Sequence, residues 1–130
     1  MATIPLVPDA IAPDGSEIYF RVVDAQRASL VEVELGPGRT SRAVLHRTVE
    51  EIWYFLAGFG EVWLRSPDGT SETTRAVGPG DTVTIPTGWA FQFRTTGGQP
   101  LRFLCYTSPP WPGDEEAVPV REGGLGAPDL

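Results

Sequence analysis

Short segments in which apolar and polar residues alternate constrain the fold of this chain more than any other feature. In one of them, Val31, Val33 and Leu35 alternate with Glu32 and Glu34. Such period-two alternation is typical of a strand with one buried face. Turn-forming glycines and prolines, 15 and 13 among 130 residues, separate these segments, and no window has helical periodicity. The sequence therefore predicts one all-β domain, a sandwich or barrel of eight or more short strands.

The two ends of the chain depart from this pattern. Residues 1–108 are interpreted as the β-barrel with an N-terminal arm, in which the apolar, proline-studded segment Ala2–Ala12 suits contact with a neighbouring copy. Residues 109–130 are interpreted as a proline-rich tail packed on the barrel. We expect Trp111 to anchor this tail rather than to cover a pocket, and the acidic run Asp114–Glu116 to be solvated.

The charged residues exclude several classes of function. All 10 positive charges are arginines, so no lysine is available for Schiff-base chemistry. The net charge is −7, and the arginines are scattered singly. Proteins that bind nucleic acid or anionic membranes carry clustered positive charge, so neither partner is expected here.

The single cysteine, Cys105, excludes an internal disulfide, and we expect it to be a small buried apolar residue in a reducing compartment. No stretch approaches the roughly 20 apolar residues that span a bilayer. Residues 1–13 lack the positive charge and long apolar run of a signal peptide. The absence of lysine and asparagine, both encoded by AT-rich codons, suggests a GC-rich bacterial genome. A cytoplasmic bacterial protein is therefore the expectation.

The only histidine, His46, is the centre of the candidate site. It ends one predicted strand, and Glu51 begins the next, which is rich in aromatic residues. If these two strands pair as a hairpin, side chains near the turn converge on one face. Val44, His46, Glu51 and Trp53 would then share an inward surface.

Residues at fixed distances around His46 resemble the first motif of the cupin superfamily. Five residues separate Gly38 from Val44, and four separate His46 from Glu51. Six more separate Glu51 from Gly58. The spacing to Gly58 also selects Glu51, rather than its neighbour in the chain, as the inward-facing glutamate.

Further along the chain, Gly80, Pro86 and Gly88 resemble the second cupin motif in their spacing. The two motifs together cover residues 38–95. The resemblance implies a single-domain cupin-type double-stranded β-helix, which is a jelly-roll barrel. It also implies a homodimer, because small cupins commonly pair through sheet edges.

The resemblance further implies four metal-ligand positions, of which two lack a donor. By position, Val44 and Phe91 stand where cupins usually have histidines, whereas His46 and Glu51 are kept. Zinc and iron sites normally need at least three protein ligands. No cofactor is therefore expected, and a divalent metal, if bound, would use His46 and Glu51. The further donors it could recruit are Cys105, Tyr106 and Glu50.

Without a metal, the inward apolar side chains predict an aromatic pocket for a small organic molecule. A His46–Glu51 pair in that pocket could act as acid and base. The aromatic residues could equally fill the core of a sandwich. The side chains expected to line the pocket or its mouth are Val44, Trp53, Phe55, Trp63, Trp89, Phe91, Phe93 and Tyr106.

Three functions remain open at this point. The favoured one is a cupin barrel that binds a small organic molecule, either as a pure binding module or as a metal-independent isomerase, cyclase or lyase. The second is a metal-dependent cupin enzyme, such as a dioxygenase or sugar isomerase, with an altered ligand set. The third is a non-catalytic structural or regulatory protein whose pocket is packed shut.

Overall fold

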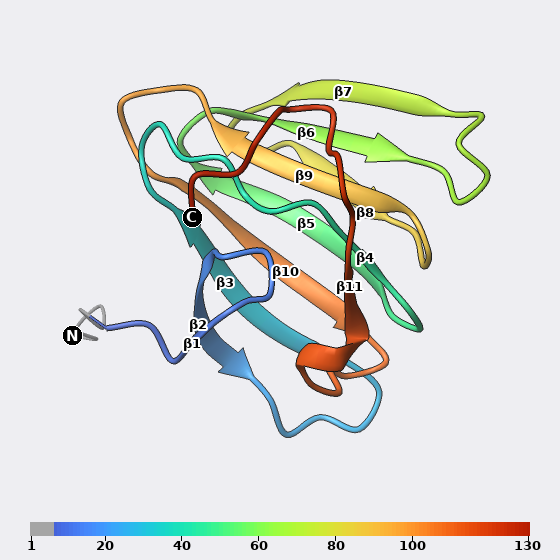
Figure 1. Ribbon diagram of the computed structural model, residues 1–130. Coiled ribbons are helices and arrows are strands. Elements are labelled where there is room, and N and C mark those ends of the chain that lie inside the picture. Colours follow the sequence, from blue (N-terminus) through green and yellow to red (C-terminus); the bar gives the residue numbers. More distant parts are fainter. Residues whose placement is uncertain (1–6) are drawn as a thin grey trace.

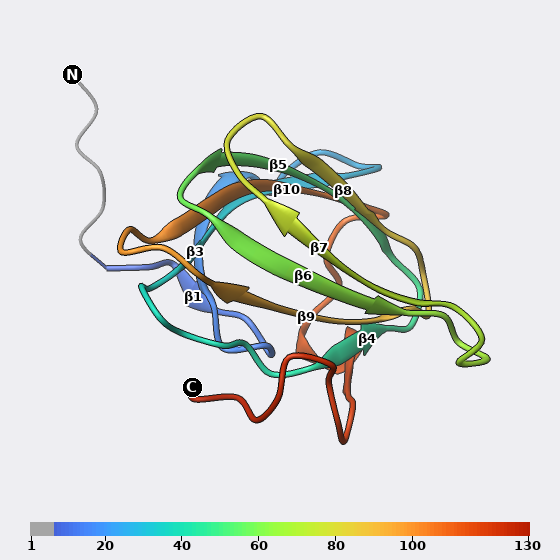
Figure 2. The same ribbon diagram turned by 90° about the horizontal axis from the view of Figure 1, so that it is seen from above.

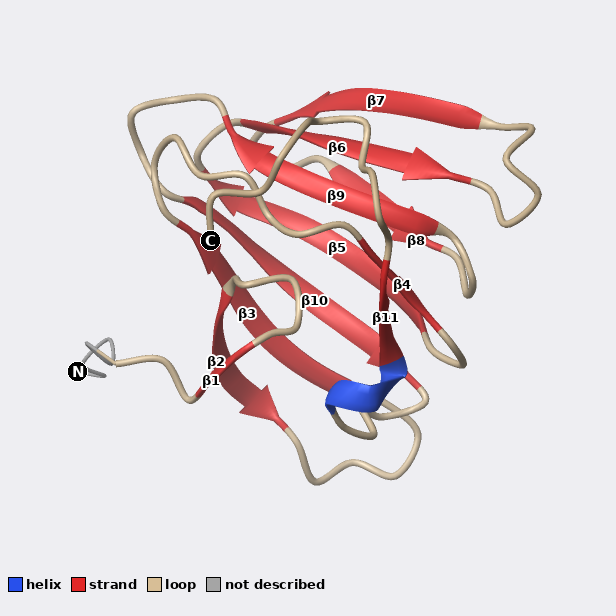
Figure 3. Ribbon diagram, viewed as in Figure 1, coloured by secondary structure: helices blue, strands red, loops and turns tan. Residues whose placement is uncertain are grey.

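The computed structural model describes residues 7–130, and nearly all of its regular structure is β-strand (Figures 1 and 3). The all-β prediction is confirmed. Eleven strands and one short 3₁₀ helix, η1, follow one another along these residues. Their bounds are β1 Ala10–Ile11, β2 Glu17–Val22, β3 Ser29–Leu35, β4 Val44–His46, β5 Glu50–Ala57, β6 Gly60–Arg65, β7 Glu72–Val77, β8 Thr82–Ile85, β9 Ala90–Thr95, β10 Leu101–Ser108, η1 Asp114–Glu116 and β11 Ala117–Pro119.

The strands form two antiparallel sheets that face each other (Figure 2). One sheet has the order β1-β2-β3-β10-β5-β8, and the other has the order β11-β4-β9-β6-β7. β4 and β5 therefore lie in different sheets, and the hairpin considered from the sequence is not formed. His46 on β4 and Glu51 on β5 instead reach the space between the sheets from opposite layers.

The beginning of the described chain belongs to its own first sheet. β1 pairs with β2, where Ala10 lies opposite Ile18 and Ile11 lies opposite Glu17. The expected arm over residues 2–12 thus contributes part of its length to this sheet, and its residues 2–6 lie outside the described part of the chain. Among residues 7–130, no helix has the length and apolar character needed to cross a bilayer.

The alternating pattern of β5 fixes which side chains form the core. Trp53 and Phe55 are buried, whereas the neighbouring Ile52 and Tyr54 are close to half-exposed. Trp53 stacks on Phe103 of β10, with ring centroids 4.3 Å apart. Large fully buried rings of this kind contribute most of the apolar burial in a small domain. The aromatic cluster therefore forms a rigid base beneath the site described below.

The tail is more ordered than the sequence predicts, because β11 extends the second sheet by pairing with β4 (Figure 1). Glu116, at the end of η1, is buried. Its carboxylate accepts hydrogen bonds from the backbone N–H groups of Thr48 and Val49, at 2.6 and 2.8 Å, and from the Thr48 hydroxyl at 2.7 Å. The expectation of a solvated acidic run is therefore wrong for Glu116, although Asp114 and Glu115 are exposed.

The remainder of the tail lies against the outside of β9 and β6. The buried amide of Gln92 donates to the Gly126 carbonyl at 2.8 Å and accepts from the Leu125 N–H at 2.9 Å. Val120 and Leu125 pack against a cluster of buried residues that includes Trp63. The tail thus covers a second, smaller apolar cluster on the far side of this sheet.

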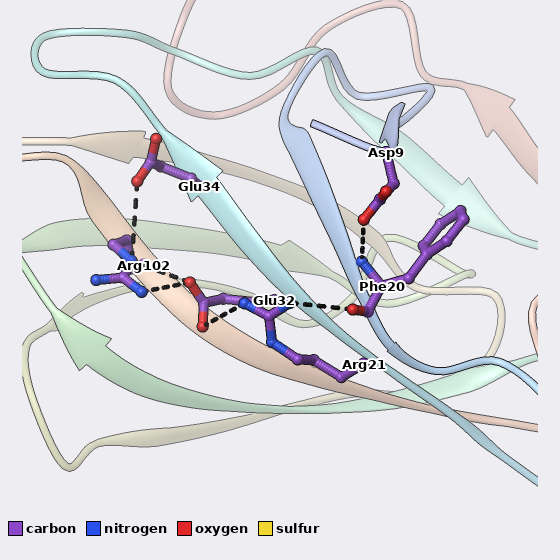
Figure 4. A network of polar contacts seen from close by, with 6 residues as sticks. All are labelled: Asp9, Phe20, Arg21, Glu32, Glu34 and Arg102. Atoms are coloured by element: carbon purple, nitrogen blue, oxygen red, sulfur yellow. Dashed lines mark hydrogen bonds and ion pairs between the residues drawn. The ribbon is translucent and has the colours of Figure 1, made fainter. Parts of the chain in front are cut away.

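An ionic network lies on the outer face of the first sheet (Figure 4). The buried carboxylate of Glu32 accepts hydrogen bonds from the Nε and Nη2 groups of Arg102, and Arg21 lies 3.5 Å from its other oxygen. Arg102 also lies 3.8 Å from the carboxylate of Glu34. Cationic partners thus compensate the buried charge of Glu32.

Candidate functional site

A cavity of about 380 Å³ lies between the two sheets. Its walls come from β1 and the turn that follows it, and from β2, β3, β5 and β10 of the same sheet. β4 and β11 of the opposite sheet and the first turn of the tail complete them. This volume falls within the range of small-molecule sites. Apolar side chains that line it include Ile18, Val31, Val33, Val44 and Phe103.

His46 lines the cavity from the end of β4. Its side chain is inward because the short strand alternates buried, half-buried and buried positions, and the residue is only 4% exposed. The imidazole lies edge-on to Phe91 and Trp111, with centroids 5.0 and 5.1 Å away. Its Nδ1 atom is buried and has no hydrogen-bond partner among the described residues. A buried polar atom without a partner is costly, and this one belongs to a residue that lines the cavity.

Glu51 is also buried and lines the same cavity. One carboxylate oxygen accepts a hydrogen bond from the Trp53 indole N–H at 3.0 Å, and the other accepts one from the Thr107 hydroxyl at 2.8 Å. Within the described residues, no hydrogen bond or ion pair joins Glu51 to His46. The two residues expected to form a pair therefore share a cavity, but each has its own separate surroundings.

A second buried carboxylate in the cavity wall, Asp14, was missed by the sequence analysis. Its Oδ1 atom accepts hydrogen bonds from the backbone N–H and the hydroxyl of Ser16, at 2.9 and 2.6 Å. Burial raises the pKa of Asp14 against these hydrogen bonds, and the nearby charge of Glu51 raises it further. The local sequence Pro13-Asp14-Gly15 is typical of an exposed turn, so nothing in it indicated burial.

Only two of the residues predicted to bind a ligand through apolar contact, Val44 and Trp53, line the cavity. The others lie elsewhere, because strand alternation fixes the face of a side chain but not its depth in the sandwich. Trp63 belongs to the cluster under the tail, Trp89 is half-buried against the main core, and Tyr106 is on the exposed face of β10. The fully enclosed core contains Phe55, Phe91 and Phe93.

Several residues that were not predicted to bind a ligand also line the cavity. Phe103, Cys105 and Thr107 alternate along the inner face of β10, and Trp111 reaches the cavity from the tail. Trp111, which we expect from the sequence to anchor the tail rather than to cover a pocket, lies against His46 of the barrel and is among the residues that line the cavity. Cys105 is buried, as expected. Burial and the nearby charge of Glu51 raise the pKa of its thiol well above 9.0, which keeps it protonated.

The donor set does not fit a tightly held metal ion. In the described part of the chain, no three His, Cys, Asp or Glu side chains are grouped closely enough to hold one together. Val44 and Phe91 present hydrocarbon at two of the positions where the cupin motif has histidines. Both oxygens of Glu51 already accept hydrogen bonds. Of the two motif donors that this chain keeps, only His46 is not already engaged in side-chain hydrogen bonds among the described residues.

Comparisons with known proteins agree with the fold. A family model described as "Cupin domain" matches residues 31–107. An uncharacterized protein of Methanocaldococcus jannaschii is 29% identical over 112 residues, which cover 83% of this chain and 85% of that protein. A glucose-6-phosphate isomerase of Thermococcus gammatolerans is 41% identical over 55 residues, but these cover only 42% of this chain and 29% of the isomerase.

Solved structures show the same architecture at low sequence identity. An oxalate decarboxylase of Bacillus subtilis, a protein with Mn(II) centres, superimposes with a TM-score of 0.72 at 19% identity. The match covers 88% of this chain and 30% of the decarboxylase. The cupin domain of Schizosaccharomyces pombe Cnp3 superimposes with a TM-score of 0.64 at 14% identity, over 72% of this chain and 64% of that one.

Proposed function

Because this chain belongs to the cupin domain family, whose model matches residues 31–107, we propose that it binds a small organic molecule in the cavity between its sheets. One observation carries the proposal. The wall of a cavity of about 380 Å³ holds a buried imidazole whose Nδ1 atom has no hydrogen-bond partner among residues 7–130. A bound molecule that hydrogen bonds with this nitrogen would remove the penalty.

The surrounding side chains suggest how such a molecule would be held. Trp53 and Phe103 form one wall, and Trp111 forms another beside His46. The apolar body of a ligand would lie between these rings, and its polar group would face His46. This division between many apolar contacts and a few polar ones is usual for small-molecule sites.

A metal-independent reaction is the second candidate, and the shared position of His46 and Glu51 in one cavity favours it. His46 lines the cavity, and an imidazole can serve as a general acid or base. Glu51 uses both oxygens as hydrogen-bond acceptors, so its contribution would be electrostatic. A turnover assay with any ligand that a fragment screen identifies decides between binding alone and catalysis.

The named relatives suggest a metal-dependent alternative with other substrates. Oxalate and glucose 6-phosphate are anions, and oxalate decarboxylase has Mn(II) centres. In this chain no arginine is among the described residues that line the cavity, and the donor set does not fit a metal. Elemental analysis of the purified protein tests this alternative, because about one zinc, iron, manganese or nickel per chain would favour it over our proposal.

Filling the cavity should abolish binding. Val31 lines the cavity from the inner face of β3, and Val31→Phe would place a ring in it. We expect hits from a ligand-observed NMR screen of fragments to lose at least about tenfold in affinity in this variant. The matched control is Leu30→Phe, one position earlier on the opposite face of the strand. Fragment binding that Val31→Phe leaves unchanged, or no binding at all, would contradict the proposal.

We expect His46 to contribute to ligand binding but not to the stability of the fold. We expect His46→Leu to keep the free energy of unfolding unchanged or to raise it by up to about 2 kcal/mol, because the substitution removes a buried unpaired polar atom. Urea denaturation measures this change. Ligands that hydrogen bond with the imidazole should lose affinity in the same variant. A clear loss of stability would show that His46 has a structural role.

A further inference from the structure

The formal charges around the cavity are almost all negative. Asp14 and Glu51 line its wall, and Asp114 lies among its lining residues in the tail. The chain contains no lysine, and none of its 10 arginines is among the described residues that line the cavity. His46 is the only lining residue there that could carry a positive charge. Even a protonated imidazole would be outnumbered by the carboxylates.

The two buried carboxylates lack cationic partners. Among the described residues, Glu51 accepts hydrogen bonds from the neutral side chains of Trp53 and Thr107, and Asp14 accepts them from Ser16. In the part of the chain that the structure describes, no ion pair includes either carboxylate. Leaving water is costly for an unpaired charge, so burial raises the pKa of Asp14, and a cation beside this carboxyl group would favour its ionised form.

The same molecule offers a direct contrast. The carboxylate of Glu32 on the outer face is buried to a similar degree, and Arg102 and Arg21 compensate it (Figure 4). Arginines therefore pair with the buried Glu32 on the outer face of the sheet. Asp14 and Glu51, which line the cavity, have no such partner in the described chain. A cation in the cavity would supply the missing positive charge.

Two further features of the wall suit an organic ammonium group. The Nδ1 atom of the buried His46 has no partner in the described chain, and in a neutral imidazole this nitrogen can accept a hydrogen bond from an N–H group. The rings of Trp53, Phe103 and Trp111 line the same cavity. Aromatic faces attract cations and also contact apolar groups.

We propose that the ligand of this cavity is an organic amine in its ammonium form, attached to a compact apolar or aromatic body. The inference rests on the proposed binding function and specifies the class of ligand. The ammonium group would lie near Asp14 and Glu51, and one of its N–H groups would donate to His46. Carboxylates and phosphates of the same size would be repelled by these two acids.

Three probes of nearly equal size and different charge test the inference on the full chain. They are 2-phenylethylammonium, 2-phenylethanol and phenylacetate, and alkylamines such as the first are protonated at neutral pH. Isothermal titration calorimetry gives their affinities. We expect the ammonium to bind at least about tenfold more tightly than the carboxylate, with the alcohol between them, since unlike charges attract strongly in a partly buried site.

Variants then assign the preference to the cavity. Asp14→Asn keeps an oxygen that can accept from Ser16 and removes the charge, so the ammonium should lose about fivefold or more while the alcohol changes less than about twofold. Glu51→Gln serves as the second variant if Asp14→Asn does not fold. Glu50→Gln is the matched control, because Glu50 is the neighbouring acid and is exposed; it should change neither affinity.

The outcomes separate this inference from the function on which it rests. Equal affinities for the three probes, or tightest binding of phenylacetate, would overturn the amine assignment and leave small-molecule binding intact. The amine assignment also fails if none of the three probes binds but other fragments bind and lose affinity in Val31→Phe. Absence of any binding, in the probes and in the fragment screen alike, would overturn both.

Discussion

Replacing Trp53 with alanine should lower the free energy of unfolding by about 3–5 kcal/mol, the usual range for deleting a large buried ring. The side chain is 2% exposed and lies at the centre of the aromatic cluster. It stacks on Phe103 and meets Phe91 and Phe93 edge-on, at 5.4 and 5.1 Å. Urea denaturation followed by circular dichroism measures the loss.

Two further variants divide this effect into its parts. Trp53→Phe keeps an aromatic ring but removes the indole N–H that donates to Glu51, so we expect a loss of about 1–3 kcal/mol. Tyr54→Ala, one position later and nearly half-exposed, should cost much less, because surface substitutions rarely exceed about 0.5–1 kcal/mol. Equal losses for Trp53→Ala and Tyr54→Ala would refute the assigned inner face of β5.

Replacing Glu116 with alanine should lower the free energy of unfolding by about 2–3 kcal/mol, because three donors lose a charged acceptor and two of them are backbone N–H groups. Glu115→Ala is the matched control. Its side chain is exposed, and the hydrogen bond from Arg47 is made to its backbone carbonyl, which alanine keeps. Chemical denaturation of both variants at neutral pH tests the prediction.

The contribution of Glu116 should also depend on pH. Burial alone would raise the pKa of Glu116, but the hydrogen bonds from Thr48 and Val49 together outweigh burial and hold the pKa below its usual 4.5. A carboxyl group whose pKa is lower in the folded state stabilises the fold above the unfolded pKa and loses this effect as the pH falls through the folded pKa. The stability difference between the natural protein and Glu116→Gln should therefore be full above about pH 5 and shrink below pH 4.5.

The comparison between the natural protein and Glu116→Gln isolates the titration of Glu116, because all other acidic groups titrate in both proteins. Burial raises the pKa values of Asp14 and Glu34, which act in the opposite direction, and their effects cancel from the difference. A difference that stays constant between about pH 6 and pH 3 would contradict the assigned hydrogen bonds.

Local alternation explains why much of the architecture could be predicted. The pattern Val31, Val33, Leu35 marks a strand wherever it occurs, and the inward orientation of Glu51 followed from its distance to Gly58. The turn glycines also set the family resemblance, which the family match confirms. Gly58 shows the physical reason. Its φ of 81° and its contact with the backbone at Pro100 leave no room for a side chain.

The contents of the cavity depend on contacts that no local pattern contains. Glu116 looked solvated because its partners, Thr48 and Val49, lie 68 and 67 residues earlier in the chain. Trp111 reaches His46 only because the tail returns to pair with β4. Alternation likewise assigned Phe93 to an inner face but could not show that Phe93 lies in the enclosed core while Phe103 lines the cavity.

The place of β10 in its sheet has a consequence for synthesis of the protein. β3 and β5 leave the ribosome early, but the strand that lies between them, β10, ends only at Ser108. Until then both neighbours have an unpaired edge, and exposed edges of this kind invite pairing with other chains. Nascent chains stalled before residue 101 should therefore depend on chaperones to stay in solution, whereas chains released after residue 108 can close the sheet on themselves.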